Sequence, residues 1–152
     1  MIKHRMISTL LIFIVVTYAG CSSSVPIRFD GKVIDANAIN EGQLLYEQYC
    51  AACHGASGQG QFPDAPNMPD ATGRYGAPPH NPDGHTWHHD DGLLLRYVRD
   101  GGMGDPDSFY PMPAFGSQLT DQQIVSIIGY IKTLWTDEQR MVQQERSALA
   151  AD

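Results

Sequence analysis

The sequence predicts an all-α fold in which three to four helices and long irregular loops wrap around one large apolar group. Two observations predict it. Apolar side chains recur every three to four residues in separate segments, which places them on one face of a helix. Most of the 15 glycines and 10 prolines fall between Gly55 and Gly116. Because a small chain with so much loop buries little core of its own, the loops need an apolar body to pack on.

The first 20 residues predict an export signal peptide of the lipoprotein type. Lys3 and Arg5 precede a short apolar run and then small residues, as in secretory signals. The segment ends at Ala-Gly-Cys, which resembles the bacterial lipoprotein signal and implies that Cys21 receives lipid. Tyr18 departs from that pattern, which usually has Leu there. Cleavage to a soluble protein and retention as an anchor remain the alternatives.

Residues 21–39 predict a tether that lifts a domain off the membrane, because their Ser-rich and mixed-charge sequence shows no sustained period. Loss of Lys3 and Arg5 with the signal peptide takes the formal net charge from -7 to -9. So acidic a chain argues against a nucleic-acid partner. The negative charge serves either to dock a partner with a basic face or simply to keep the protein soluble.

The first expected helix begins near Asn40. Gly42, Tyr46 and Cys50 recur at a four-residue spacing, so they share one helical face. The segment that follows, from Gly55 to Pro82, is rich in Gly, Pro, Asn and Asp and predicts a long loop.

Two further helices follow in the second half of the chain. Asp90 and Asp91 can cap a short helix that stops at Gly101. Thr120 and Gln123 form a capping box ahead of a strong apolar stripe that runs to Trp135. Residues 137–152 are charged and Gln-rich, and either prolong that last helix or fray. The expected domain therefore spans 40–136, with 137–152 as an extension.

Cys50-Ala51-Ala52-Cys53-His54 carries the chemistry. Two thiols one helical turn apart can reach the two vinyl groups of a porphyrin, and the adjacent imidazole then faces the iron. A zinc site would need a second pair of ligands, and the chain has no further Cys pair. A thioredoxin-like redox pair would follow a strand, which the preceding sequence does not predict. We therefore expect one haem c, bound covalently through Cys50 and Cys53, with His54 as proximal iron ligand.

From Asn40 to Trp135 the chain resembles a class I c-type cytochrome with a single haem. The resemblance rests on the haem motif, a proline loop, a Met-Pro segment and a closing helix. It implies that the first and last helices cross closely, with Gly42 and Tyr46 against Ile127 and Tyr130.

The same resemblance implies two further site residues. Ala65-Pro66-Asn67-Met68 is similar to a family segment whose proline carbonyl accepts a hydrogen bond from the proximal histidine, so Pro66 is the expected partner of His54. Tyr110-Pro111-Met112-Pro113 is similar to the segment that supplies a thioether to the iron, so Met112 is the expected distal ligand. Met103 is the alternative, because spacing alone does not separate the two.

A second cluster, His85, His88 and His89, surrounds Trp87. Three histidines within five residues could bind copper or zinc, or one could replace Met112 at the iron. In a loop before a helix, such histidines are more often surface groups, and Trp87 is expected to pack against the domain.

These observations predict a carrier of single electrons between membrane-associated or exported redox proteins in a respiratory chain, on the periplasmic or another extracytoplasmic side. An iron with both axial positions filled has no vacant site for substrate, so we expect no enzyme activity. Three alternatives remain: a haem peroxidase or gas-binding protein with an open iron position, a metal-binding lipoprotein that uses His85–His89, and a subunit held permanently in a larger oxidase or dehydrogenase.

Overall fold

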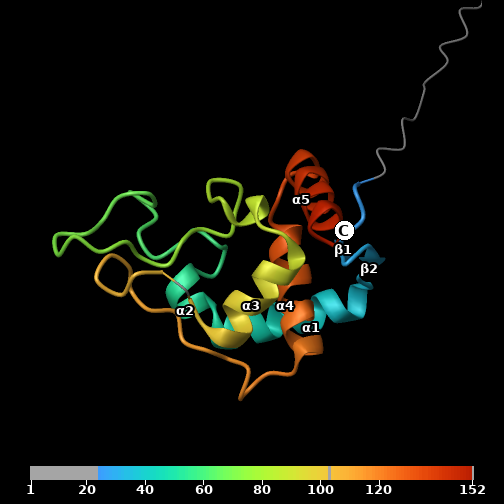
Figure 1. The fold of residues 1–152 in the computed structure, drawn as a ribbon, viewed down its shortest axis with the longest axis horizontal. Helices are drawn as coiled ribbons and strands as arrows, with labels where there is room; N and C mark the ends of the chain where they lie inside the picture. Colours follow the sequence, from blue (N-terminus) through green and yellow to red (C-terminus); the bar gives the residue numbers. More distant parts are fainter. Residues whose placement is uncertain (1–23, 103, 152) are drawn as a thin grey trace, which may run out of the picture.

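The computed structural model describes residues 24–102 and 104–151. Helices make up most of their regular structure (Figure 1). The helices are α1 (Ala36–Tyr49), α2 (Ala51–His54), α3 (Asp91–Asp100), α4 (Asp121–Thr133) and α5 (Asp137–Ala150), with a 3-10 turn η1 (Thr86–His88) and a hairpin of β1 (Arg28–Phe29) and β2 (Lys32–Val33). The all-α prediction is confirmed, with a small hairpin in addition.

The close crossing of α1 and α4 forms the centre of the fold. A Cβ atom added to Gly42 would lie 1.9 Å from the carbonyl oxygen of Ser126, so only hydrogen fits at this position. The fully buried Tyr46 packs its ring 5.2 Å from that of Tyr130. The sequence predicted this crossing, and the structure confirms it.

The core extends from this crossing to α3 and to the loop before α4. Its fully or nearly fully buried apolar residues are Tyr46, Cys50, Leu94, Val98, Phe115, Leu119, Ile124, Ile127, Ile128, Ile131 and Trp135. Cys50 therefore belongs to the core itself, which ties the candidate site to the main packing of the domain.

Helix starts follow the capping rules. Asp90 accepts a hydrogen bond from the backbone of Leu93, and Thr120 forms the expected capping box with Gln123. The first helix, however, begins at Ala36 rather than near Asn40, because the side chain of Asp35 accepts hydrogen bonds from the backbone N–H groups of Asn37 and Ala38. A single acidic residue thus adds a full turn to the expected helix.

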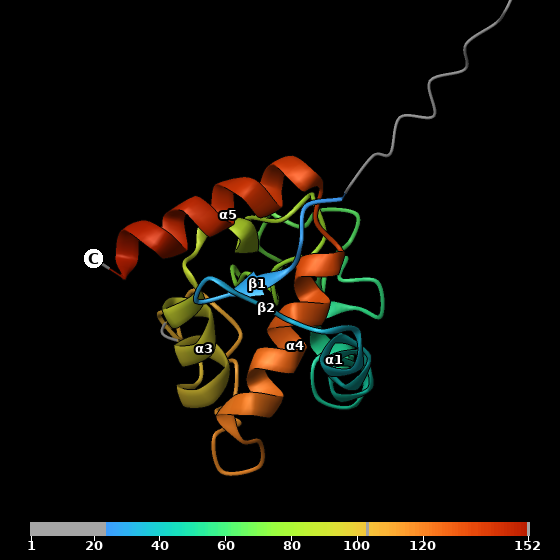
Figure 2. The same cartoon turned by 90° about the vertical axis from the view of Figure 1, so that its right-hand side faces the viewer.

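Part of the predicted tether is folded. Residues 28–33 form the hairpin, and Ile34 N–H donates to the carbonyl of Ile27 at 2.9 Å. Its turn places Asp30 and Gly31 at positive φ (46° and 73°). The hairpin lies beside α4, as the view in Figure 2 shows. The folded part of the chain therefore begins well before residue 40.

The C-terminal extension is a separate helix. The chain turns after α4 at Trp135, and Thr136 opens α5 with a capping box that includes Gln139. In Figure 2, α5 runs across the hairpin end of α4. The extension neither prolongs α4 nor frays.

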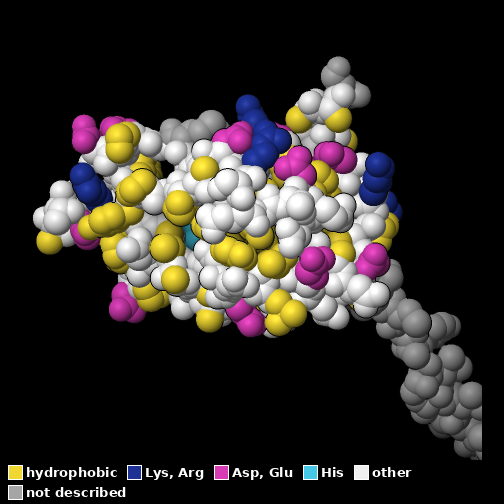
Figure 3. Space-filling view, turned by 90° about the horizontal axis from the view of Figure 1, so that it is seen from below, with side chains coloured by type: hydrophobic (Ala, Val, Ile, Leu, Met, Phe, Trp, Pro, Cys, Tyr) yellow, Lys and Arg dark blue, Asp and Glu magenta, His cyan; other side chains and the backbone are white. Residues whose placement is uncertain are grey.

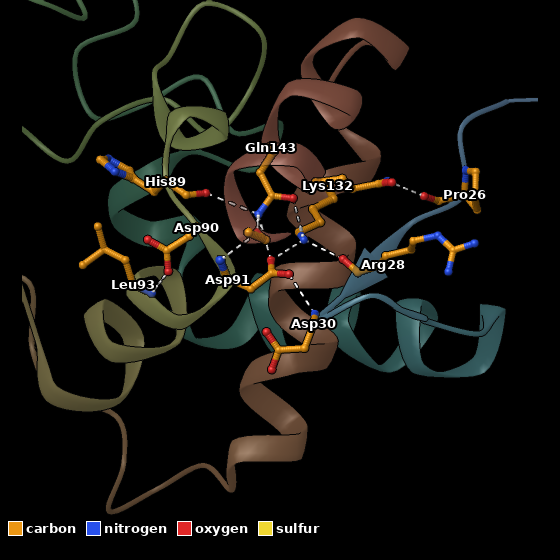
Figure 4. A network of polar contacts seen from close by, with 11 residues as sticks. Pro26, Arg28, Asp30, His89, Asp90, Asp91, Leu93, Lys132 and Gln143 are labelled. Carbon is orange, nitrogen blue, oxygen red and sulfur yellow. Dashed lines mark hydrogen bonds and ion pairs between the residues drawn. The ribbon is translucent and has the colours of Figure 1, made fainter. Parts of the chain in front are cut away.

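A buried polar network holds α5 and the hairpin to the rest of the domain (Figure 4). The Lys132 ammonium donates to Asp91 at 2.5 Å, to Gln143 at 2.9 Å and to the carbonyl of Arg28 at 2.6 Å. Asp91 also accepts from the backbone N–H of Asp30 at 2.9 Å. Burial lowers the pKa of Lys132, and the carboxylate of Asp91 opposes that shift. The network therefore joins α3, α4, α5 and the hairpin.

Within residues 24–102 and 104–151, none of the helices has the length and apolar character needed to span a bilayer. The predicted signal peptide and Cys21 lie outside the described residues.

Candidate functional site

The two cysteines sit where α1 passes into α2. Cys50 is the capping residue between α1 and α2, and its N–H donates to the carbonyl of Tyr46; Cys53 lies in the short α2. Both thiols are free, with Cys50 buried and Cys53 exposed. Burial raises the pKa of Cys50 to about 12, with a further contribution from Cys53. The helical spacing predicted for the pair is present, and one thiol faces the core while the other reaches solvent.

His54 ends α2 and is 6% exposed. Its Nδ1 lies 2.8 Å from the carbonyl oxygen of Pro78. Because a carbonyl only accepts, Nδ1 carries a proton, and in the neutral ring Nε2 then keeps its lone pair. Burial lowers the pKa of His54, and the hydrogen bond to Pro78 partly opposes this. The residue is thus a neutral imidazole with one nitrogen committed and the other available to a metal.

The hydrogen-bond partner of His54 is not Pro66, and the prediction of that residue was wrong. Residues 62–76 form an outward excursion that is closed at its base, where Gln61 N–H donates to the carbonyl of Ala77 and Ala77 N–H donates to the Gln61 side chain, both at 3.0 Å. Pro66 lies within the excursion and is partly exposed. The chain returns to the site at Pro78, which supplies the carbonyl.

His80 is a site residue that the sequence analysis did not identify. Its ring stacks on that of His54, with centroids 4.0 Å apart and planes 20° from parallel. Tyr46 approaches the ring of His80 edge-on, with the two ring centroids 6.1 Å apart. Burial lowers the pKa of His80 well below its ordinary value, with smaller contributions from His54 and His85. Its only sequence signal was a histidine directly after two prolines, which by itself indicates no site.

Met112 lies in the loop between α3 and α4. Its side chain is partly buried and packs against the apolar core, and its carbonyl accepts a hydrogen bond from Gly102 N–H at 3.0 Å. Two residues earlier, the Tyr110 hydroxyl donates to Asp70 at 2.7 Å, which ties this loop to the excursion. The alternative ligand, Met103, lies outside the described residues.

The cluster at residues 85–89 does not assemble a metal site. The rings of His85 and His89 lie 5.4 Å apart, edge to face, and His88 packs against Trp87. Trp87 packs against the core as expected, and its Nε1 donates to Gly84 at 2.9 Å. Among the described residues, no group of three or more His, Cys, Asp or Glu side chains is placed to hold a metal ion. The structure gives the copper or zinc alternative no support.

The residues present fit a covalently bound haem. Two free thiols lie one helical turn apart, and the imidazole beside them has its Nδ1 proton already bonded to Pro78. On the face shown in Figure 3, hydrophobic side chains gather around a recess in which a histidine is visible. Thiols, an available imidazole nitrogen and an apolar surface are the donor set and the surroundings that haem c requires.

Comparison with known families supports this interpretation. The model of the family described as cytochrome c matches residues 39–135, which contain most of α1, all of α2 to α4 and every residue of the site. The hairpin and α5 lie outside the match.

Two curated relatives are both described as the CcoP subunit of a cbb3-type cytochrome c oxidase. The protein from Azospirillum sp. (strain B510) is 30% identical over 108 residues, which are 71% of this chain and 32% of the relative. The protein from Azospirillum brasilense is 32% identical over 100 residues, which are 66% of this chain and 30% of the relative. The chain thus spans just under a third of the length of these relatives.

A solved structure shows the same fold. Cytochrome CL from the marine methylotroph Methylophaga aminisulfidivorans MPT aligns with a TM-score of 0.50 over 82% of this chain and 92% of that one, at 16% identity. At that identity, the likeness concerns the fold alone.

Proposed function

This chain belongs to the cytochrome c family and carries haem c, and we propose that it passes single electrons between redox proteins of a respiratory chain while anchored to a membrane by lipid at Cys21. Haem electron transfer follows from the family. The partners, the anchor and the residues assigned below are the proposal.

The observation that carries the proposal is the state of His54. Its ring is buried, its Nδ1 donates to Pro78, and its Nε2 is left for the iron. A hydrogen bond from the ring nitrogen that does not bind the metal fixes the tautomer of a metal-binding histidine and makes the ring a better donor. When bound, the haem supplies one-electron redox chemistry at its iron. Cys50 and Cys53 are the thiols that attach it.

We assign the distal side to Met112. Pro111 and Pro113 restrict the backbone on both sides, and the Gly102 hydrogen bond fixes its carbonyl. A thioether is a soft ligand that raises the potential relative to a second imidazole. With His54 and Met112 both in place, the protein leaves no position for a substrate, which favours a carrier over a peroxidase or gas-binding protein.

The partners are proposed from the charge and from the relatives. The formal net charge, -7 for the full sequence and more negative once Lys3 and Arg5 are removed with the signal peptide, suits partners with basic docking faces. Both curated relatives are named as subunits of an oxidase. We therefore place the chain among the proteins that deliver electrons to, or pass them within, such a complex. Co-purification from detergent-treated membranes separates a permanently bound subunit from a free carrier.

The test is the visible spectrum of the full chain, made in a host with a haem-attachment system. We expect sharp low-spin bands after reduction and the weak far-red sulfur-to-iron band after oxidation. Met112→Ala should lower the reduction potential, abolish the far-red band and open the iron to carbon monoxide. A high-spin wild-type spectrum would contradict the proposal, and an unchanged variant would remove Met112 from the iron.

A further inference from the structure

We propose that His80 is a positioning residue: its ring stacks on His54 and sets the direction in which the His54 ring faces the haem iron. The inference rests on the proposed role of His54 as the proximal ligand. It assigns a task to a histidine that the haem motif does not include.

A single hydrogen bond does not fix the orientation of the His54 ring. Rotation about the bond between Cβ and the ring is broad, because it joins a tetrahedral to a planar atom. The contact between Nδ1 and the Pro78 carbonyl, at 2.8 Å, holds one edge of the ring. The rest of the ring can still swing about that edge. A nearly parallel ring at 4.0 Å limits this swing, since rotation would drive the two rings into each other.

The backbone of His80 is held from two sides. Its N–H donates to the carbonyl of Gly58 at 2.7 Å, and its carbonyl accepts from the indole of Trp135 at 2.8 Å. Trp135 is itself a buried core residue, 3% exposed. The residue is therefore anchored to the end of α4 on one side and to the turn after the haem motif on the other.

The ring of His80 is held by Thr86. The Thr86 hydroxyl donates to the carbonyl of Pro79 at 3.1 Å, so it accepts from Nδ1 of His80, which lies 3.0 Å away. Thr86 is buried, and its hydroxyl satisfies both partners at once. These two hydrogen bonds hold one edge of the His80 ring, and its contacts with His54 and Tyr46 limit the remaining rotation.

Three consecutive residues therefore act as one template for the His54 ring. Pro78 supplies the acceptor for Nδ1, Pro79 anchors the threonine, and His80 supplies the stacked ring. The two prolines have a fixed φ, which reduces the freedom of the segment. An alanine at position 80 would keep the acceptor but lose the stacked surface.

The experiment compares haem-loaded variants of the full chain by electron paramagnetic resonance of the ferric form and by the NMR shifts of the haem methyl groups. Both readouts depend on the plane of the axial histidine. His80→Ala should change the spread of the g-values and the order of the methyl shifts. His80→Phe keeps a stacked ring and should stay near the wild type. Thr86→Val keeps His80 but frees its ring, and should give a smaller change in the direction of the alanine variant.

His88→Ala is the matched control, because this histidine packs against Trp87 and should leave both readouts unchanged. Haem content and the low-spin spectrum should stay at wild-type levels in every variant, which separates this inference from the proposed function. If His80→Ala does not fold, Thr86→Val takes its place as the test of the proposal. Wild-type g-values and methyl shifts in His80→Ala, or in Thr86→Val if that variant takes its place, would overturn the proposal.

Discussion

Two regions of this molecule bury polar side chains, and they do so in opposite ways. Around Lys132, an ammonium, a carboxylate and an amide meet, and their donors and acceptors satisfy one another. Around His54, the carbonyl of Pro78 satisfies one nitrogen of the ring, Nδ1. The first arrangement is complete in itself, whereas the second leaves Nε2 of His54 as the nitrogen that we propose for the iron.

The two regions also differ in what builds them. The Lys132 network joins helices and the hairpin, and two of its four elements lie outside the family match. The histidine pair lies inside the match and is held by loop carbonyls from Gly58 to Pro79. The additions to the family domain are thus fixed by charge, and the haem site by backbone geometry.

Removal of the thiols should break the site most completely. Cys50→Ala combined with Cys53→Ala leaves no group to form thioether bonds, so no haem should remain attached after denaturation. Haem staining of a denaturing gel measures this directly. Because the Lys132 network makes no use of the thiols, the Lys132→Met variant should stain like the wild type. Staining of the double cysteine variant would contradict covalent attachment.

Loss of Lys132 from the buried network should have a smaller but measurable effect on stability. Lys132→Met leaves the buried Asp91 carboxylate without its cation, which should lower the free energy of unfolding by about 3–5 kcal/mol. Asp91→Leu added to Lys132→Met removes the orphaned charge and should recover much of that loss. Urea unfolding of the haem-loaded proteins gives the values. Equal stability of the single variant and the wild type would show that the pair does not hold α5.

The smallest expected effect lies on the surface, where the excursion meets the Met112 loop. Hydrogen bonds from Thr72 and Tyr110 lower the pKa of Asp70 from 3.8 to about 2. A carboxyl group with a lowered pKa stabilises the fold at pH values above its ordinary pKa. That contribution is lost as the pH falls toward 2. Tyr110→Phe should move the pKa of Asp70 part of the way back to 3.8. A carboxyl NMR titration measures the shift, and an unmoved value would mean that the contact is not formed in solution.

The sequence could predict those features that depend on neighbouring residues. Asp90 and Thr120 cap their helices as expected because a cap acts within one turn. The haem motif is equally local. Asp35 was missed because the irregular sequence around it hid its capping role. Features that depend on the path of a long loop were not predictable.

Pro66 and Pro78 show why. Each stands in a proline-containing stretch, and a segment that resembles a family pattern pointed to the first. Which one reaches His54 depends on where Gln61 and Ala77 close the excursion, a pairing across 16 residues that leaves no periodic signal. His80 was missed for the same reason, since its stacking on His54 exists only once the loop has returned.

Because Gln61 and Ala77 close the base of the excursion, the length of its outer part does not determine the path of the chain at Pro78 and His80. The entropy of closing a loop grows only slowly with the number of residues in it. Residues 63–69 can therefore change in length or sequence if Asp70 and Tyr75 keep their contacts with the loop that carries Met112, while Pro78 and His80 stay in place beside the haem motif. The outer part of the excursion is thus the position at which a new recognition sequence would least disturb the contacts around His54.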